Sequence, residues 1–240
     1  MKKDIWRCAA HVILTRSFLV CSCCCLFMNS ITTAVGQPLI EAKHQTYTII
    51  YDYAKMSPAA VLWTLQASDF NGSQVTKPKY FKMDRLLPKP RVHNDEFSFS
   101  HYQRGHLCPS GDRDSRRSWF NDTFVTSNIV PMTPVTNSGA WKETEVVCRS
   151  ACAAGHRLKI VAGPLWYQTT AVSNTFSRPR VPSAMFKMVV CTIHQGESCA
   201  WVVPNDDVPR HERDLRCTVD SVSNILDEPL KSFVSVWIRK

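Results

Sequence analysis

Four residues spaced four apart could form a hydrolytic site. Asn137, Trp141, Glu145 and Arg149 recur at this interval within residues 134–152, a stretch that favours a helix. At about 100° per residue they drift through about 120°, so they share one broad helix face. That face presents an amide oxygen, a carboxylate and a guanidinium, and oxygen ligands suit a hard cation such as Mg²⁺. We therefore expect a magnesium site, with Mn²⁺ as an alternative ion.

A second segment supplies a base and a cation. Residues 102–110 read Tyr-Gln-Arg-Gly-His-Leu-Cys-Pro-Ser. His106 is a candidate general base, and Arg104 and Arg149 are candidate phosphate clamps, because a guanidinium binds phosphate through parallel hydrogen bonds. With a divalent cation, this set predicts phosphodiester hydrolysis: the base activates water, the cation polarises the phosphate and the arginines balance the developing charge.

Each of these residues also has a purely structural explanation. A histidine beside a glycine is more often structural than catalytic, and an asparagine such as Asn137 caps helices. Glu145 and Arg149, at i and i+4, could form a solvated pair that contributes a few tenths of a kcal/mol. Trp141 suits a core position whatever the function, and Arg104 suits the surface. Only the ordered set favours chemistry.

Three short motifs resemble the DNA/RNA non-specific endonucleases, the ββα-metal family that includes endonuclease G and the bacterial sugar-non-specific nucleases. Members carry D-R-G-H, S-N-x-x-P-Q and N-x-x-x-W-x-x-L-E boxes. The counterparts here lie at residues 103–106, 127–132 and 137–145. The resemblance extends over most of the chain and implies an α+β fold, with a central, mostly antiparallel sheet and flanking helices.

The resemblance implies a role for one residue of the first motif and for two residues of the third. His106 corresponds to the general base that activates the attacking water. Asn137 corresponds to the sole direct protein ligand of a hydrated Mg²⁺, and Glu145 to the carboxylate that holds the metal's waters. The family leaves 5′-phosphate ends, which the resemblance implies here too.

Further positions match groups around the family's site. Asn128 corresponds to an asparagine beside the site, and Arg104 and Arg149 to arginines that support it and bind phosphate or the leaving group. Lys77, four residues before a phenylalanine, is the nearest match to an upstream basic residue that binds substrate, with Lys82 as a rival.

The sequence departs from the family pattern at three positions. Gln103 replaces the usual aspartate, which is neither base nor ligand, so the change is compatible with activity but alters how the box is held. Met132 replaces glutamine and Thr144 replaces leucine, which we interpret as packing changes. Gln103 supports an alternative function, a catalytically weakened nuclease-fold protein that binds nucleic acid.

Apolar and β-branched patterns predict the elements that must position these residues. Strands are expected at residues 46–53, 60–65, 123–127, 158–162, 186–193 and 200–203. Helices are expected at residues 134–152 and 218–226, the first with Thr133 as N-cap and Pro134 at the first helical position. Since nothing marks an interdomain linker, we interpret residues 37–240 as one α+β domain.

The first 36 residues have the pattern of a signal peptide. A basic start precedes an apolar stretch at residues 8–28, which Thr15-Arg16 interrupts, and Ala34 and Gly36 fit a cleavage site. This predicts a secreted or periplasmic protein with no stable membrane association after leader removal, and an organelle such as the mitochondrion as the alternative. The formal net charge of +9 fits DNA and RNA as partners. The oligomeric state stays open, with a homodimer as one option.

Six of the eleven cysteines follow the leader: Cys108, Cys148, Cys152, Cys191, Cys199 and Cys217. An even count behind an export signal predicts disulfides. The connectivity stays open, with a Cys191–Cys199 pair across a hairpin turn at residues 195–196 as one option, and we expect Cys108 to join a disulfide near the site. Cys148 and Cys152 have no accompanying Cys/His pattern with zinc spacing.

The sequence therefore leaves three candidate functions. The first is a secreted, Mg²⁺-dependent endonuclease that cleaves DNA and RNA with little sequence preference. The second is the nucleic-acid binder without strong catalysis, and the third is a disulfide-stapled structural or toxin-like protein whose basic surface meets a membrane. The intact His106, Asn137 and Glu145 favour the first.

Overall fold

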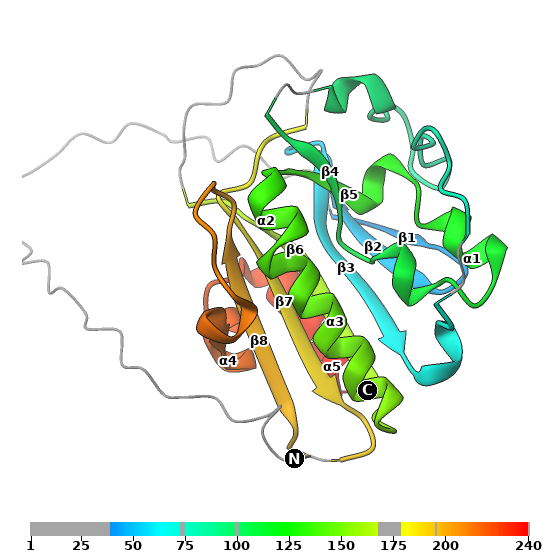
Figure 1. Cartoon of the computed structure of the whole chain (residues 1–240). Coiled ribbons are helices and arrows are strands. Elements are labelled where there is room, and N and C mark those ends of the chain that lie inside the picture. Colours follow the sequence, from blue (N-terminus) through cyan, green and yellow to red (C-terminus); the bar gives the residue numbers. More distant parts are fainter. Residues whose placement is uncertain (1–38, 73–74, 99–100, 168–178, 195, 240) are drawn as a thin grey trace, which may run out of the picture.

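The computed structural model describes residues 39–72, 75–98, 101–167, 179–194 and 196–239, so the expected leader lies outside the described residues. A seven-stranded antiparallel sheet forms the centre, in the order β1-β2-β3-β6-β7-β8-β9 (Figure 1). Its strands are β1 Ile40–Lys43, β2 Tyr47–Asp52, β3 Ser57–Leu65, β6 Leu158–Leu165, β7 Ala184–Cys191, β8 Ser198–Pro204 and β9 Arg216–Cys217. The expected α+β class with a mostly antiparallel sheet is confirmed.

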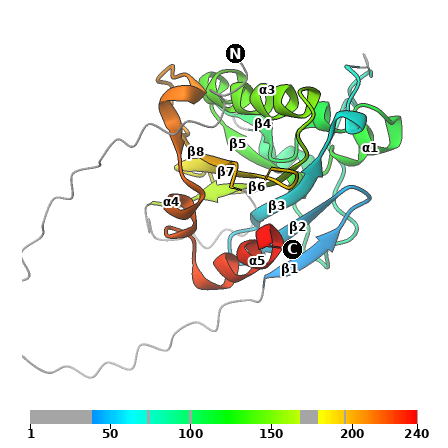
Figure 2. The ribbon, with the colours of Figure 1, turned by 90° about the horizontal axis from the view of Figure 1, so that it is seen from below.

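Helices cover both faces of this sheet, and Figure 2 shows α3 on one side with α4 and α5 on the other. The helices are α1 Arg117–Asp122, α2 Pro134–Ser138, α3 Ala140–Ala153, α4 Val219–Ser223 and α5 Glu228–Arg239. Short 3-10 helices lie at Ala67–Asp69, Asn94–Phe97, Ser110–Asp112, Thr126–Asn128 and Glu212–Leu215. None of the helices in the described ranges has the length and apolar character needed to cross a membrane.

Strand β3 shows why the sheet has two cores. Val61, Trp63 and Leu65 belong to the cluster that α3 covers, whereas Ala60 and Leu62 belong to the cluster that α4 and α5 cover. A strand buried on both faces needs an almost continuous apolar run instead of an alternating one. Both clusters therefore depend on the same central strands, which hold α3 and its polar side chains at a fixed position.

Most predicted elements correspond to observed ones. The strands expected at residues 46–53, 60–65, 158–162, 186–193 and 200–203 are β2, β3, β6, β7 and β8. The helix expected at residues 218–226 is the shorter α4, whose N-cap Thr218 accepts a hydrogen bond of 3.0 Å from the Ser221 amide. Helix α5 and the short strand β1 were not predicted.

The strand predicted at residues 123–127 is wrong. Val125 meets Lys82 in an isolated bridge, and residues 126–128 form a 3-10 helix. The hydroxyl of Thr126 donates to the Val92 carbonyl at 2.8 Å, and that of Ser127 donates to Asp84 at 2.6 Å. Such side-chain hydrogen bonds compete with a strand ladder and favour a turn.

Candidate active site

A two-stranded sheet and a following helix carry the candidate residues. β4 (Gln103–His106) pairs antiparallel with β5 (Ile129–Met132), and β5 leads directly into α2 (Figure 1). The predicted N-cap is confirmed, because the Thr133 hydroxyl accepts a hydrogen bond of 3.2 Å from the Thr136 amide and Pro134 begins the helix. This β-β-α unit brings all three sequence motifs together.

The single helix expected at residues 134–152 is wrong, because the chain leaves the helical conformation at Gly139. Its φ of −99° and ψ of −118° separate α2 from α3. A Cβ at this position would lie 2.5 Å from the Val135 carbonyl oxygen, so the break requires glycine. Asn137 therefore belongs to α2, whereas Trp141, Glu145 and Arg149 belong to α3.

Two hydrogen bonds fasten the two ends of β4 to these helices. The Asn137 amide nitrogen donates to the side-chain oxygen of Gln103 at 2.8 Å. The Trp141 indole nitrogen donates to the His106 carbonyl oxygen at 2.9 Å. The proposed base and the proposed metal ligand thus lie on one rigid unit, with the ligand's amide oriented by Gln103.

His106 lies in an apolar environment. Its ring centroid is 5.1 Å from that of Phe81 and 4.9 Å from that of Phe124. Burial, together with the positive charge of Lys77, lowers the pKa of His106 to about 4. The imidazole is therefore neutral at pH 7, and its buried Nε2 has no hydrogen-bond partner among the described residues. A neutral imidazole can accept a proton.

Glycine at position 105 allows close packing under this histidine. A Cβ at Gly105 would collide with the Met132 side chain, which is fully buried in the core shared with Trp141. Met132 thus fills the space under β4, as we expected for a packing change.

The α3 side of the site holds a chain of charges. Arg149 donates to Asp112 at 2.8 Å and lies 3.8 Å from Glu145. Asp112 also accepts a hydrogen bond of 3.1 Å from the Trp63 indole. Burial raises the pKa of Glu145 to about 7, Asp112 adds to this rise, and Lys187 and Arg149 oppose it. A nearby cation would favour the ionised carboxylate.

Lys187 is a site residue that the sequence patterns missed. It comes from β7, is 1% exposed, and its ammonium group lies 4.1 Å from the centre of the Trp141 ring. The same group donates to the Thr144 hydroxyl at 2.8 Å, so Thr144 has a polar role besides packing. A lysine inside the apolar run of β7 was the available signal. Gln103 and Asp112 were missed as partners because their contacts are tertiary.

The other predicted residues lie around this unit. Arg104 donates to the Asn94 carbonyl at 3.1 Å, and its buried Nε has no partner among the described residues. Lys77 is exposed and close enough for its charge to act on His106. Lys82 is also exposed, and its backbone pairs with the segment of residues 124–126.

Asn128 is fully buried, and backbone groups use its amide. Its nitrogen donates to the carbonyls of Cys108 and Thr123 at 2.9 and 3.0 Å, and its oxygen accepts from the Cys108 amide at 3.0 Å. These bonds fix the segment that follows His106. The arrangement favours a positioning role for Asn128, which we expected beside the site.

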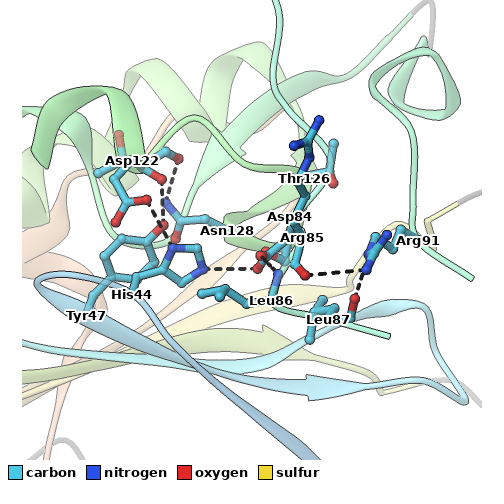
Figure 3. Close-up of polar contacts among 12 residues, drawn as sticks. His44, Tyr47, Asp84, Arg85, Leu86, Leu87, Arg91, Asp122, Thr126 and Asn128 are labelled. Carbon is cyan, nitrogen blue, oxygen red and sulfur yellow. Dashed lines mark hydrogen bonds and ion pairs between the residues drawn. The ribbon is translucent and has the colours of Figure 1, made fainter. Parts of the chain in front are cut away.

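A buried ion network lies next to Asn128 and is bonded to the second motif. His44 lies between Asp84 and Asp122, at 3.0 and 3.2 Å, with Asn128 beside it (Figure 3). Burial opposes the charge of His44, but the hydrogen bonds and negative charges of the two aspartates outweigh it and raise its pKa to about 9. The Ser127 hydroxyl donates to Asp84 at 2.6 Å, which ties this network to the second motif.

The donor set fits a hydrated hard cation. Because the Asn137 nitrogen is held by Gln103, the oxygen of the same amide is the atom available to a metal. Glu145 adds a carboxylate that burial makes hard to ionise without a cation. Amide and carboxylate oxygens are the ligands that Mg²⁺ and Mn²⁺ prefer, and Mg²⁺ retains most of its waters.

The predicted disulfides are wrong: no disulfide joins any two of the six described cysteines. Cys108 is buried without one, and burial raises the pKa of its thiol to about 12. Cys199 lies opposite Val189 on the neighbouring strand, so Cys191 is its diagonal neighbour. Diagonal residues are about 7–8 Å apart, beyond the usual reach of a disulfide.

The chain is similar in sequence to known nucleases. A model of the DNA/RNA non-specific endonuclease family matches residues 28–231. A nuclease of Nostoc sp. is 30% identical over 211 residues, covering 80% of this chain and 73% of that protein. The mitochondrial nuclease EXOG of Xenopus laevis is 30% identical over 190 residues, covering 72% of this chain but only 53% of that protein.

More distant relatives are similar over most of the same span. Human mitochondrial endonuclease G is 24% identical over 176 residues, covering 68% of this chain and 59% of that protein. The EndoG chain of an EndoG/EndoGI crystal structure superimposes with a TM-score of 0.69 at 22% identity, covering 77% of this chain and 82% of that chain. The matched span contains all three motifs, so the chain belongs to the DNA/RNA non-specific endonuclease family.

Proposed function

We propose that this protein is a metal-dependent endonuclease that hydrolyses phosphodiester bonds of DNA and RNA without strong sequence preference. The observation that supports this most directly is the half-buried imidazole of His106, which is neutral at pH 7 and can therefore accept a proton. It lies on the strand that also positions the proposed metal ligand Asn137. The family supports a phosphodiester hydrolase, and the donor chemistry supports Mg²⁺ or Mn²⁺ as the ion.

In this mechanism, the neutral imidazole of His106 accepts the proton of the attacking water. Asn137 and, through water, Glu145 would hold the cation, which would stabilise the negative charge of the leaving oxygen. Arg149, oriented by Asp112, lies beside Glu145 and binds the phosphate or the leaving group. Arg104 provides a second guanidinium on β4, and Asn128 positions the strand segment that carries the base.

Substrate binding depends on charge. Lys77 and Lys82 are exposed on either side of the segment that leads to Phe81, whose ring contacts His106, so both can contact a polyanionic backbone. Contacts to phosphates carry no sequence information, so they support the proposed cleavage without strong sequence preference. Binding is therefore expected to weaken as salt concentration rises, because counterions are released on binding.

A direct assay tests the proposal. The purified chain is incubated with supercoiled plasmid and with RNA, in Mg²⁺ or in EDTA, beside His106→Ala. Loss of the general base should lower the rate by about 10²–10⁴-fold. A folded wild-type chain that leaves both substrates intact in Mg²⁺ and in Mn²⁺ would contradict the enzyme function.

The second function is nucleic-acid binding with weakened catalysis, which the replacement of the family aspartate by Gln103 favours. It predicts retardation of nucleic acid on a gel without cleavage in Mg²⁺. The restoring variant Gln103→Asp separates the two functions, because it should generate strong cleavage only if the glutamine impairs the site.

We also propose that residues 37–240 form the nuclease domain behind a leader at residues 1–36. Several relatives are named as mitochondrial nucleases, which supports the organelle alternative. Imaging of a C-terminally tagged chain, with N-terminal sequencing of the mature protein, tests both assignments; sedimentation velocity tests for a homodimer.

A further inference from the structure

Four side chains outside the three sequence motifs meet beyond the C-terminal end of α3. They are His156, Cys191, His194 and Glu197, and their ligand atoms all lie within 4.8 Å of one another. The His156 Nδ1 is 3.5 Å from the Cys191 sulfur and 3.2 Å from a Glu197 oxygen. The His194 Nδ1 is 3.7 Å from both of these atoms.

Four of the six ligand-atom separations match those of a tetrahedral zinc site. Zinc binds sulfur at about 2.3 Å and nitrogen or oxygen at about 2.0–2.2 Å, so two ligands of a tetrahedron lie about 3.3–3.7 Å apart. The four measured distances run from 3.2 to 3.7 Å. Both imidazoles turn the same nitrogen, Nδ1, toward the sulfur and the carboxylate, which is the convergence that one shared cation requires.

The fold fixes the ligands from two sides. Gly155, with a φ of 101°, ends α3, and the His156 amide donates to the Ala151 carbonyl at 3.1 Å. Cys191 is the last residue of β7, and its amide donates to the Glu197 carbonyl at 2.9 Å. The Cys-x-x-His-x-x-Glu spacing of the β7–β8 connection therefore faces a histidine held by the end of α3.

Burial and charge also point to a cation. The Cys191 thiol is buried, and the Glu197 carboxylate oxygen Oε2, which is also buried, lies 3.2 Å from the His156 Nδ1. One Zn²⁺ bound by a thiolate, a carboxylate and two neutral imidazoles gives a site of zero net charge. The thiol proton passes to solvent when the metal binds.

We propose that His156, Cys191, His194 and Glu197 form a structural zinc site that joins the end of α3 to the β7–β8 connection. Four protein ligands close the coordination sphere, which is typical of structural zinc. Sulfur and nitrogen ligands discriminate against Mg²⁺, so this site is separate from the proposed catalytic cation. The 14 residues of α3 span about 21 Å, with Asn137 before one end and His156 beyond the other.

The first experiment measures metal on the purified full chain. Elemental analysis should find one zinc per chain after dialysis against excess Mg²⁺. Replacement by Co²⁺ should give the intense visible bands of a tetrahedral complex and a thiolate-to-cobalt charge-transfer band in the near ultraviolet. A strong chelator should lower the melting temperature by about 10 °C, and Zn²⁺ but not Mg²⁺ should restore it.

Variants locate the metal. Cys191→Ser should abolish the charge-transfer band, and His194→Ala should weaken cobalt binding by more than about 100-fold, because even supporting residues change metal affinity by 10- to 100-fold. His211→Ala is the matched control, since His211 is an exposed histidine that contacts a different glutamate, Glu143, at 3.1 Å. Asn137→Ala should keep the cobalt spectrum whether or not the chain is a nuclease.

Three results would overturn the zinc site. One is wild-type protein that binds no zinc at micromolar concentration. Another is a cobalt spectrum without thiolate charge transfer. The third is equal cobalt affinity in His194→Ala and His211→Ala, and because His194 is 54% exposed this variant tests the site even where Cys191→Ser fails to fold.

Discussion

Gln103 holds Asn137 through a hydrogen bond of 2.8 Å between the two side-chain amides. The residue that departs from the family motif thus contacts the residue that the motif assigns to the metal. The contact orients the Asn137 oxygen as a ligand, and it does so without a negative charge. We infer that the substitution tunes the affinity for the cation while leaving the base unchanged.

Gln103→Ala is expected to raise the Mg²⁺ concentration needed for half-maximal activity by about 10- to 100-fold, because Asn137 loses its orienting partner. Gln103→Glu should lower this concentration, since it adds a negative charge beside the cation. A Mg²⁺ titration of plasmid cleavage measures both. Ser138→Ala, an exposed neighbour of Asn137, is the control; a Gln103→Ala titration that coincides with it would refute the orienting role.

The low pKa of His106 predicts the acid side of the pH profile. Since the base must be neutral, kcat/KM should stay high down to about pH 5 and fall as pH decreases through about 4. Lys77→Met removes a positive charge that disfavours the imidazolium, so this fall should move to higher pH. Kinetics over a pH series test this. Lys79→Met, an exposed lysine of the same loop, should move it less.

Asp112→Asn tests the ion pair behind Arg149. Asp112 is 1% exposed and accepts from both Arg149 and Trp63, so loss of its charge leaves the guanidinium without a buried counterion. We expect the free energy of unfolding to fall by about 2 kcal/mol, less than for a fully buried pair because Arg149 is partly exposed. We also expect a lower kcat. Urea unfolding and steady-state kinetics measure the two effects.

The exposed pair of Arg213 and Asp214 provides the comparison for this variant. Its side chains are 74% and 65% exposed. Asp214→Asn should change the free energy of unfolding by less than about 0.5 kcal/mol. Equal stability of the two variants would mean that the Asp112 pair contributes no more than a surface pair.

His44 predicts a pH-dependent stability. Its pKa is about 9 in the folded chain and near 6.5 when unfolded, so the folded state binds the extra proton between these values. The contribution, up to about 3 kcal/mol, is complete below pH 6.5 and is lost as pH rises through about 9. Urea unfolding from pH 6 to pH 10 should show this loss in the wild type, and a flatter profile in His44→Gln.

Sequence patterns were sufficient for the fold class, five central strands, the N-cap at Thr133 and the family motifs. These features depend on local chemistry: apolar runs form buried strands, and threonine followed by proline starts a helix. The break at Gly139 was not predicted, because its cause is a close approach to the Val135 carbonyl that spacing alone does not show. The assignment of Asn137 to the continuous helix failed for this reason.

Tertiary structure decided the rest, because the relevant partners are far apart in the chain. Lys187 contacts Trp141 across 46 positions of sequence, and Gln103 contacts Asn137 across 34. An even cysteine count predicted disulfides, but strand register kept Cys191 and Cys199 diagonal to each other, and the fold instead brought Cys191 to His156. Side-chain type is fixed by sequence, whereas the distance between two side chains depends on how the whole sheet packs.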